Sequence, residues 1–397
     1  MDWITTFNAL KAVYIDEAFS NIAINEAIEQ HPNCSTGFVR TFAKGVIRDT
    51  LRLDHYIDQL ADRGIKGIKN RTLIILRMGI YAIEVLDSVP DHAAVNEAVK
   101  LARKVSKGSD KFVNGMLRSF IREREQLDVC GTFPAELGAL IREQYGDEAE
   151  EIMKALDTPV PLVLRPNRLK DEKPEPVIVE GGNVIGGDDF KKGKFSVQSL
   201  SSIEAIEAFA PNAGSTVLDM CAAPGGKTCA MAEIMNNQGS ITACDVYDHR
   251  LKLIEAQARR LGIDIITTEL LDGTDHRKDF DNKFDYVLAD VPCSGLGVIP
   301  SKPEIKLRTD VSSYKELTDI QTAILKNAIS YAKPGGLIEY STCTINRDEN
   351  DGVVERVLAE LKDEGLLEAK LPQIIEKCSI LPYNNKVGFF YCILRKQ

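Results

Sequence analysis

The chain has 397 residues, of which 44% are hydrophobic and 27% charged, a composition ordinary for a soluble globular protein of two or three domains. Acidic and basic side chains are interspersed through residues 1–19, which excludes a signal peptide. The most apolar stretch, residues 73–86, contains Arg77 and Glu84 and is too short to span a bilayer. We therefore expect a protein without a membrane-spanning segment.

The cysteines and histidines indicate a reducing compartment and no metal centre. The nine cysteines are an odd number without a Cys-x-x-Cys pair, and the five histidines include no His-x-x-x-His pair. Free thiols are typical of the cytoplasm, where disulfides are rare. We predict a cytoplasmic protein that binds no metal.

The net charge of −10 argues against a nucleic acid partner, but the charge is unevenly distributed. Residues 1–130 hold 18 basic and 17 acidic side chains, so the acidic excess lies in the rest of the chain. Residues 63–77 carry five basic side chains and no acid, and residues 100–122 carry seven against Asp110 alone. Such patches can bind a phosphate backbone, although a solvated helix face explains them equally well.

Residues 1–130 are predicted to form an all-helical domain. Apolar side chains recur at helical spacing over 94–105, after a helix start at Pro90 and Asp91 and before a helix end at Gly108. Four basic side chains are predicted on the opposite side of this helix and are the candidate RNA-binding residues: Lys100, Arg103, Lys104 and Lys107.

Residues 131–198 differ in composition from both flanking parts. They contain short apolar runs between Pro- and Gly-rich segments, above all over 171–189, and are predicted to form a small, partly stranded linker module. Its basic side chains either contact RNA or belong to polar loops: Arg165, Arg168, Lys170, Lys191, Lys192 and Lys194.

Residues 199–397 alternate between short apolar runs and amphipathic stretches. The predicted strands cover 216–220, 240–245, 264–269, 284–290, 336–342 and 387–396, and the predicted helices include 249–261, 314–332 and 346–361. The last helix is expected to have Asn346 as its cap, with Glu349 three residues on. This alternation predicts a doubly wound, mainly parallel α/β sheet. In such a sheet the ligand lies beyond the carboxyl ends of the strands, where these side chains gather: Asp219, Asp245, Asp272, Asp290 and Cys343.

The stretch CAAPGGKT, Cys221–Thr228, follows the first of these strands and is predicted to bind a ligand. Its end matches a phosphate-binding P-loop, and Asp290 would then be a magnesium ligand. However, Cys221 stands where such a loop needs its first glycine, and Pro224 removes a backbone donor. The dinucleotide fingerprint Gly-x-Gly-x-x-Gly is absent. A singly charged carboxylate, such as the methionine part of S-adenosylmethionine, needs fewer donors.

The next acids along the sheet suit the rest of S-adenosylmethionine. Asp245 ends the second strand 26 residues after Asp219, roughly where nucleotide-binding sheets place a carboxylate on the ribose hydroxyls. Asp272 follows the third strand and is placed to reach the adenine amine. Any one of these acids is readily explained as a helix cap or a surface charge, but their succession at strand ends favours a cofactor site.

Two cysteines indicate the chemistry. Cys293 lies three residues beyond Asp290 in ADVPCSG, and Cys343 ends a later strand in YSTCT. A lone cysteine in such a position is usually a small buried residue. Two of them at the same predicted edge, one beside an acid, favour nucleophilic catalysis.

Several long motifs resemble a known family. LDMCAAPGGKT, DVPCSGLGV, KPGG, STCT and RDEN resemble the RNA 5-methylcytosine methyltransferases, while PDHAAVNEAVKLARKV and KFVNGMLR resemble the helical RNA-binding domain of the NusB type. The combination is similar to the Sun/RsmB family, which methylates cytosine in small-subunit ribosomal RNA. The resemblance covers nearly the whole chain and implies three parts: 1–130 NusB-like, 131–198 a linker module, and 199–397 a Rossmann-like methyltransferase domain.

The resemblance also implies roles for individual residues. The cofactor loop that binds S-adenosyl-L-methionine comprises Cys221, Ala222, Ala223, Pro224, Gly225, Gly226 and Lys227, with Asp245 on the ribose, Asp272 on the adenine and Asp290 where cofactor and cytosine meet. Cys343 would be the nucleophile that adds to carbon 6 of the cytosine. Cys293 would help to release the product, and a protonated Asp290 would donate to ring nitrogen 3. The partner is RNA, with 16S ribosomal RNA the expected target.

The chain departs from the family pattern in four places. Val291 stands where the family's DAPCSG has an alanine, and the segment between Arg165 and Phe195 is shorter than expected for the family, which predicts a trimmed middle module. Ser199 follows Gln198 where the family has an aspartate, and Val387 replaces the acid of the family's DGFF. Two alternatives therefore stay open: an RNA-binding ribosome-assembly factor that has lost catalysis, and a P-loop NTPase. Retention of Cys293, Cys343 and Asp290 argues against the first.

Overall fold

The computed structural model describes residues 1–171, 175–179, 184, 186–365 and 367–397. Part of the Pro- and Gly-rich stretch 171–189 therefore lies outside the described residues. The chain folds into two compact units, one made of Met1–Leu140 and Ser301–Thr309, the other of Ile141–Pro300 and Asp310–Gln397.

The first unit is all-helical, as the sequence predicts. Its helices are α1 (Asp2–Tyr14), α2 (Ser20–Gln30), α3 (Thr36–Arg48), α4 (Thr50–Leu60), α5 (Asn70–Val85), α6 (Asp91–Val105), α7 (Asp110–Glu123), most of α8 (Ala135–Tyr145), and the short α14 (Ile305–Arg308). Buried apolar side chains from α1 to α7 form one continuous core. Burial of this apolar surface supplies most of the favourable free energy of folding.

Helix α6 shows how the pattern produces the fold and where the prediction failed. The helix begins at Asp91, as predicted, and its apolar stripe is buried. It ends at Val105 rather than at Gly108, so Lys107 lies in the turn after the helix and not on its basic face.

Arg77 does not belong to the exposed basic cluster over 63–77. Its side chain is buried on α5, where Nε and Nη2 each donate to the Asp54 carboxylate at 2.6 Å and the guanidinium lies 4.5 Å from the Tyr14 ring centroid. This cation stabilises the helical core and is not available to a phosphate backbone.

The segment Ser301–Thr309 is distant in sequence from the rest of the first unit. Glu304 accepts a hydrogen bond from the Ser20 backbone N–H at 2.8 Å, with both residues buried. The Lys44 ammonium donates to the Ser301 carbonyl at 3.0 Å, and Arg308 donates to the Ala18 carbonyl at 2.8 Å. This segment, which leaves the other unit after Pro300 and returns to it at Asp310, is thus held by three polar contacts, of which the one between Ser20 and Glu304 is buried.

The second unit is built on a seven-stranded sheet, mainly parallel as predicted. The strands are β4 (Thr216–Asp219), β5 (Ser240–Asp245), β6 (Ile266–Leu270), β7 (Phe284–Asp290), β8 (Ala332–Thr342), β9 (Gln373–Ile380) and β10 (Phe389–Arg395), in the order β6-β5-β4-β7-β8-β10-β9. The five neighbouring strands β6, β5, β4, β7 and β8 are parallel to one another, and β10 pairs antiparallel with β8 and β9.

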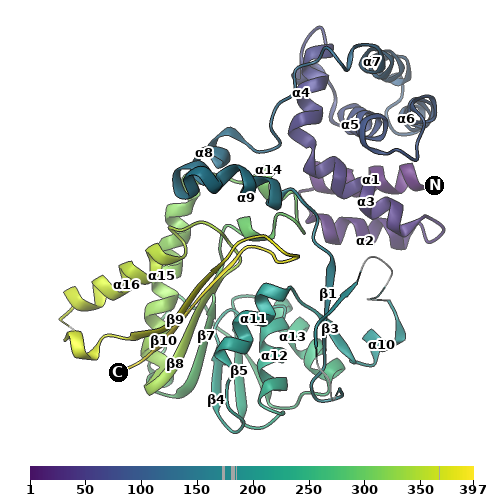
Figure 1. Cartoon of the computed structure of the whole chain (residues 1–397). Coiled ribbons are helices and arrows are strands. Elements are labelled where there is room, and N and C mark those ends of the chain that lie inside the picture. The colour runs from purple at the N-terminus through teal and green to yellow at the C-terminus, as the bar shows by residue number, and fades with distance from the viewer. Residues whose placement is uncertain (172–174, 180–183, 185, 366) are drawn as a thin grey trace. The chain divides into compact units, whose positions relative to one another are not determined.

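Helices cover both faces of this sheet (Figure 1). The unit contains the end of α8, then α9 (Ala149–Leu156), α10 (Asp188–Lys191), α11 (Leu200–Phe209), α12 (Gly226–Ile234), α13 (Asp248–Leu261), α15 (Tyr314–Tyr331) and α16 (Asp351–Asp363). Buried side chains of α11, α12 and α13 pack on one face, and those of α15 and α16 pack on the other. The predicted doubly wound α/β fold is therefore confirmed.

A smaller antiparallel sheet precedes the large one in sequence, with strands β1 (Leu162–Pro166), β2 (Val177–Val179) and β3 (Phe195–Val197) in the order β2-β1-β3. Arg165 on β1 is buried and forms an ion pair with Glu233 of α12, while its Nε donates to Gln198 at 2.7 Å. Arg168 forms an ion pair with Glu207 of α11. Arg165 therefore fixes the small sheet to the large one and cannot contact RNA.

Candidate active site

The candidate site lies at the carboxyl edge of the parallel strands. Strand β4 ends at Asp219, β5 at Asp245 and β7 at Asp290, and Cys343 follows the last residue of β8. Because these strands run in the same direction, their ends meet at one edge of the sheet. The residues nominated from three separate motifs therefore emerge side by side.

The loop from Cys221 to Gly225 turns the chain from β4 into α12. Gly225 has a φ of 101°, and a Cβ atom there would lie 3.1 Å from the Ile254 Cα of α13. Only glycine adopts this conformation readily at so close an approach. Helix α12 then begins at Gly226, so its free N–H groups face the edge where a ligand carboxylate would bind.

Asp219 has an unsatisfied oxygen beneath this loop. Its Oδ2 accepts from the Thr228 hydroxyl at 2.7 Å, but Oδ1 is buried without a partner among the described residues. Burial raises the pKa of Asp219 to about 7. A buried oxygen of this kind next to a glycine-containing loop fits a ligand that supplies a hydrogen-bond donor, as the amino group of S-adenosylmethionine would.

Asp245 is tied to the loop by a residue that the motifs did not indicate. Its Oδ1 accepts from Arg250 Nη1 at 3.1 Å and from the Tyr247 N–H at 3.2 Å, and Arg250 Nη2 donates to the Ala223 carbonyl at 3.1 Å. Arg250 thus joins the carboxylate predicted for the ribose to the loop predicted for the methionine part. An arginine five residues after a strand-end acid could have signalled this link.

Asp272 lies just beyond β6 and is exposed. Its Oδ1 accepts from the N–H and the hydroxyl of Thr274, at 2.9 and 2.7 Å, which closes a local turn. The carboxylate is held on the same side of the sheet as Asp245, where the adenine was expected.

Lys227 and Asp290 form an ion pair at the centre of the edge. The Lys227 ammonium donates to Asp290 Oδ2 at 2.7 Å, and the Ser341 hydroxyl donates to Asp290 Oδ1 at 3.2 Å. Burial lowers the pKa of Lys227, but attraction to the Asp290 carboxylate more than offsets burial, so the pKa is raised overall. The Lys227 ammonium therefore keeps its charge and holds the Asp290 carboxylate at the centre of the edge.

The two candidate cysteines meet at this edge. Cys293 Sγ and Cys343 Sγ are 3.3 Å apart, within hydrogen-bonding distance for sulfur. The hydrogen bond to Cys343 and burial together raise the pKa of Cys293 well above its ordinary value. Cys293 is therefore the protonated partner, and its S–H can stabilise a thiolate on Cys343.

Two glycines allow the Cys293 loop to approach the end of β8 closely. The Gly297 N–H donates to the Cys343 carbonyl at 3.0 Å, and the Gly388 N–H donates to the Gly297 carbonyl at 2.9 Å. A Cβ on Gly297 would lie 2.0 Å from the Gly388 carbonyl oxygen. The loop is thus locked to the strand that carries the second thiol.

Glu349 anchors the same loop, in a role that the sequence reading missed. Its carboxylate accepts from the Ser294 N–H at 2.8 Å, from Gln321 Nε2 at 2.9 Å and from Asn346 Nδ2 at 3.0 Å, and it is fully buried. The prediction of a helix capped by Asn346 is wrong, because α16 begins only at Asp351. The expected capping pair instead builds the polar support of Cys293.

Glu339 is a further buried acid that no motif indicated. It lies on β8 two residues before Ser341, so both side chains point to the same face of the strand, and its exposed fraction is 0%. Burial raises its pKa well above the ordinary value. Burial therefore favours the neutral form of this carboxyl group.

The departures at Ser199 and Val387 have structural roles. Ser199 caps α11, where its hydroxyl accepts from the Ser202 N–H at 3.3 Å, as an aspartate at this position could. Val387 is buried, and its carbonyl accepts from the Ser201 hydroxyl at 2.6 Å. Neither departure changes the cofactor loop or the thiols.

The candidate RNA-binding residues lie on the first unit. Lys100 pairs with Glu97 at 2.8 Å and Arg103 with Asp110 at 3.2 Å, and both basic side chains are exposed, as are Lys104 and Lys107. Between α6 and α7 is a cavity of about 440 Å³, lined mainly by polar and basic side chains: His92, Asn96, Arg103, Lys111, Asn114 and Arg118. Arg103 links the exposed face to this cavity.

Among the residues that the structure describes, no three His, Cys, Asp or Glu side chains are arranged to hold a metal ion. Likewise, none of the helices in the described part of the chain has the length and apolar character needed to cross a membrane.

Comparison with known proteins matches both units. Residues 206–395 match the family model "16S rRNA methyltransferase RsmB/F", and residues 4–122 match the NusB family. The chain is 33% identical to the "Probable ribosomal RNA small subunit methyltransferase B" of Bacillus subtilis, over 96% of each chain. It is also 33% identical to the protein of that name from Synechocystis, over 98% of each.

A solved structure supports the fold over the whole length. The crystal structure of PH0851 superimposes with a TM-score of 0.81 at 22% identity, covering 99% of this chain and 98% of that one. Sequence identity and coverage leave no room for a P-loop NTPase or for an unrelated helical domain. The chain belongs to the ribosomal RNA small subunit methyltransferase B family of S-adenosylmethionine-dependent methyltransferases, with an N-terminal NusB domain.

Proposed function

We propose that this protein methylates carbon 5 of a cytosine in 16S ribosomal RNA, in the cytoplasm, through a covalent bond from Cys343 to carbon 6 of the base. The observation that carries the proposal is the pair of thiols 3.3 Å apart, beside the Lys227–Asp290 ion pair. None of the nine cysteines forms a disulfide, and free thiols are typical of the cytoplasm. We assign catalysis to 199–397, RNA binding to 1–130, and a linking role to 131–198.

The cofactor loop and the acids around it would hold S-adenosyl-L-methionine. The N–H groups at the start of α12 would bind its carboxylate, Asp219 Oδ1 its amino group, Asp245 the ribose and Asp272 the adenine. When bound, this cofactor supplies an electrophilic methyl group. The residues of the chain have to make carbon 5 of the cytosine reactive enough to accept it.

Cys343 activates the base by addition. Its thiolate forms a bond to carbon 6, the carbon 5–carbon 6 double bond breaks, and the electron pair is delocalised through the ring toward nitrogen 3. The Lys227–Asp290 pair holds a proton that can be delivered to nitrogen 3, where the negative charge develops. The target base must leave its stack to reach these groups.

Cys293 acts on the sulfur of Cys343 in the last step. After carbon 5 is methylated, its proton passes to water as the base, and the electron pair of that C–H bond restores the carbon 5–carbon 6 double bond as the sulfur–carbon 6 bond breaks. The electron pair of the broken bond stays on the Cys343 sulfur, and nitrogen 3 returns its proton to the Lys227–Asp290 pair. The S–H of Cys293, kept protonated by its surroundings, donates a hydrogen bond to the departing thiolate. Loss of this donor should slow release more than addition.

The test is a denaturing gel with labelled 16S rRNA, together with transfer of a radioactive methyl group. Cys343→Ala should show neither methyl transfer nor a protein–RNA band. Cys293→Ala should attack but fail to release, leaving a slowly migrating band, whereas Asp290→Ala should lose activity without trapping RNA. Cys130→Ala, a half-buried thiol in the other unit, is the control.

A protein–RNA band with Cys343→Ala and none with Cys293→Ala would reverse the roles of the two thiols. If neither cysteine variant lost activity, covalent catalysis by these residues would be wrong. If the wild-type protein bound 16S rRNA but transferred no methyl group, the chain would be a silent assembly factor.

The helical unit would supply an electrostatic contact to RNA. Arg103 and Arg118 line the cavity between α6 and α7, and Lys104 is exposed beside it. Replacing Arg103 and Arg118 by alanine in the full chain should lower the slope of log affinity against log salt by about 1.5, because each lost phosphate contact removes about 0.7–0.9. The control Arg356→Ala, on α16, should leave the slope unchanged. An unchanged slope in the double variant would contradict the proposed RNA contact at Arg103 and Arg118.

A further inference from the structure

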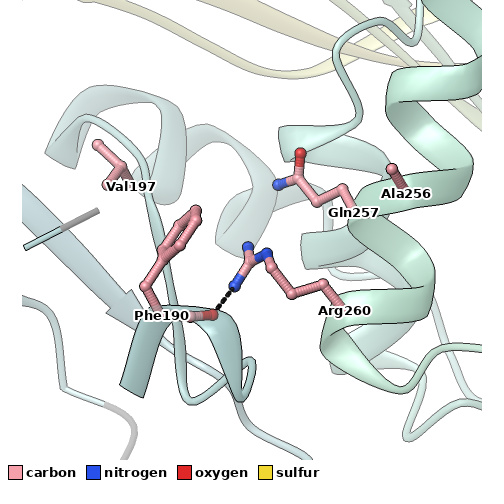
Figure 2. A pocket seen from close by; sticks show the side chains of 5 residues that line it. All are labelled: Phe190, Val197, Ala256, Gln257 and Arg260. Carbon is pink, nitrogen blue, oxygen red and sulfur yellow. Dashed lines mark hydrogen bonds between the residues drawn. The ribbon is translucent and has the colours of Figure 1, made fainter. Parts of the chain in front are cut away.

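We infer that a second pocket, between the small sheet and α13, binds one unstacked base of the substrate RNA away from the catalytic site. The base pocket, drawn in Figure 2, has a volume of about 300 Å³ and is lined by Phe190, Val197, Ala256, Gln257 and Arg260. All five residues belong to the second unit. The inference rests on the proposed action on ribosomal RNA and adds a contact that none of the catalytic motifs supplies.

An aromatic ring and a guanidinium group form a fixed stack at this pocket. The Arg260 guanidinium lies 4.0 Å from the Phe190 ring centroid. Its Nη1 donates to the carbonyls of Phe190 and Phe195, at 2.8 and 3.0 Å, and its Nη2 donates to the Ser196 hydroxyl at 3.3 Å. Aromatic rings and guanidinium planes are the surfaces on which single-stranded RNA bases stack.

The Gln257 side chain provides a polar group for the edge of a base. In Figure 2 its amide points toward the space between Phe190 and Val197. It makes no hydrogen bond to any residue that the structure describes. A carboxamide offers a donor and an acceptor side by side, which matches the pairing edge of a nucleobase.

The rim of the pocket is apolar. Val197 is 37% exposed, and Leu253 is 51% exposed one turn before Gln257, on the same face of α13. Apolar surface around a single unpaired amide favours a flat ligand with one polar edge.

The turn beside the pocket is basic, although the chain as a whole is acidic. Lys191 and Lys192 are exposed and form no ion pair with a described residue, and the Lys170 ammonium donates to the Lys192 carbonyl at 2.8 Å. Lys194 in the same turn is paired with Asp189 at 2.9 Å. The unpaired positive charges suit a phosphate backbone on either side of the bound base.

The pocket is separate from the catalytic edge. Arg260 lies ten residues along α13 from Arg250, which contacts Asp245, and this corresponds to about 15 Å at the rise of an α-helix. The bound base is therefore one that flanks the target cytosine or is brought near it by the RNA fold.

The test uses the full chain and a 16S rRNA transcript, with affinity measured by filter binding. Phe190→Leu keeps an apolar side chain but removes the ring, and Gln257→Leu keeps the size of the side chain but removes the amide. Each should weaken binding by about tenfold. The double variant should lose less than the product of the two, because both side chains contact one base. The kcat at saturating RNA should be unchanged.

Lys252→Ala, an exposed substitution on the same helix, is the matched control. Melting temperatures identify a variant that fails to fold, and the half-exposed Gln257 keeps the test valid if Phe190→Leu is destabilised. Wild-type affinity of both variants would overturn the inference. So would weaker methylation of ribosomal particles with unchanged affinity for the transcript, since the occupant would then be a protein. A wild-type chain without methyl transfer would instead contradict the proposed function.

Discussion

The polar support of Cys293 makes a sharp prediction for Glu349. This fully buried carboxylate accepts from the Ser294 backbone, from Gln321 and from Asn346, and its own carbonyl accepts from the Tyr340 hydroxyl. Glu349→Ala would remove the acceptor of four donors, because the Ser294 hydroxyl also donates to this carboxylate. Each costs about 1–3 kcal/mol, and partial relaxation limits the loss of unfolding free energy to roughly 3–5 kcal/mol. That loss lowers the melting temperature by about 10 °C.

Glu349→Gln separates function from stability. The shape is kept, but one acceptor oxygen becomes an NH₂ group that faces other donors, so we expect a smaller loss of about 1–2 kcal/mol. The displaced Ser294 backbone should move Cys293 away from Cys343. Release should then become slow, and the variant should accumulate the same protein–RNA band as Cys293→Ala.

The assays are thermal unfolding followed by circular dichroism, and the denaturing gel with 16S rRNA. Glu355→Gln, an exposed residue on α16, is the control for substitution of a nearby glutamate. Wild-type melting and wild-type turnover in Glu349→Gln would refute the view that this carboxylate positions the second thiol. Loss of stability without an adduct would make Glu349 a structural residue only.

Three further outcomes follow from the buried charges. Glu233→Ala should lower the free energy of unfolding, measured by chemical denaturation, by roughly 3–5 kcal/mol, because it leaves the Arg165 guanidinium buried without its carboxylate partner. The folded-state pKa of Asp219 is raised to about 7, so the native state binds a proton that the unfolded chain has already lost. The stability that this proton supplies is lost as pH rises from about 4 to 7. Asp219→Asn should flatten that decline when the melting temperature is measured at several pH values in this range. Arg250→Ala should weaken S-adenosylmethionine binding by about tenfold in calorimetry, by freeing Asp245 and the Ala223 carbonyl, and unchanged affinity would contradict this.

The sheet edge could be predicted because topology follows from a local pattern. Alternating strands and helices imply parallel strands, and parallel strands must end at one edge, so Asp219, Asp245, Asp290 and Cys343 had to emerge together. The convergence of these residues can be predicted without knowing the partner of any side chain. This is why the nominated residues from distant segments converge.

The errors concern side chains whose partners are distant in sequence. The charge pattern predicts an exposed Arg77, but its guanidinium is buried and pairs with Asp54, 23 residues away in sequence. Arg165 is a candidate RNA contact by sequence, but it is buried and forms an ion pair with Glu233, 68 residues away in sequence. A charge pattern read along the chain cannot distinguish a solvated cation from one that is paired inside, because the desolvation that decides the matter depends on the tertiary fold.

The same reasoning explains why the roles of the two thiols need the structure. By sequence, Cys293 and Cys343 are both cysteines at strand ends. In the fold, Cys293 is half-buried and hydrogen-bonded to the other sulfur, and both effects raise its pKa, while Cys343 directly follows the strand that carries Ser341, the donor to Asp290. We propose from this difference that Cys343 attacks the base and that Cys293 donates a hydrogen bond to the Cys343 sulfur as it leaves carbon 6. Glu349 holds the Cys293 loop for that step by accepting from the Ser294 N–H.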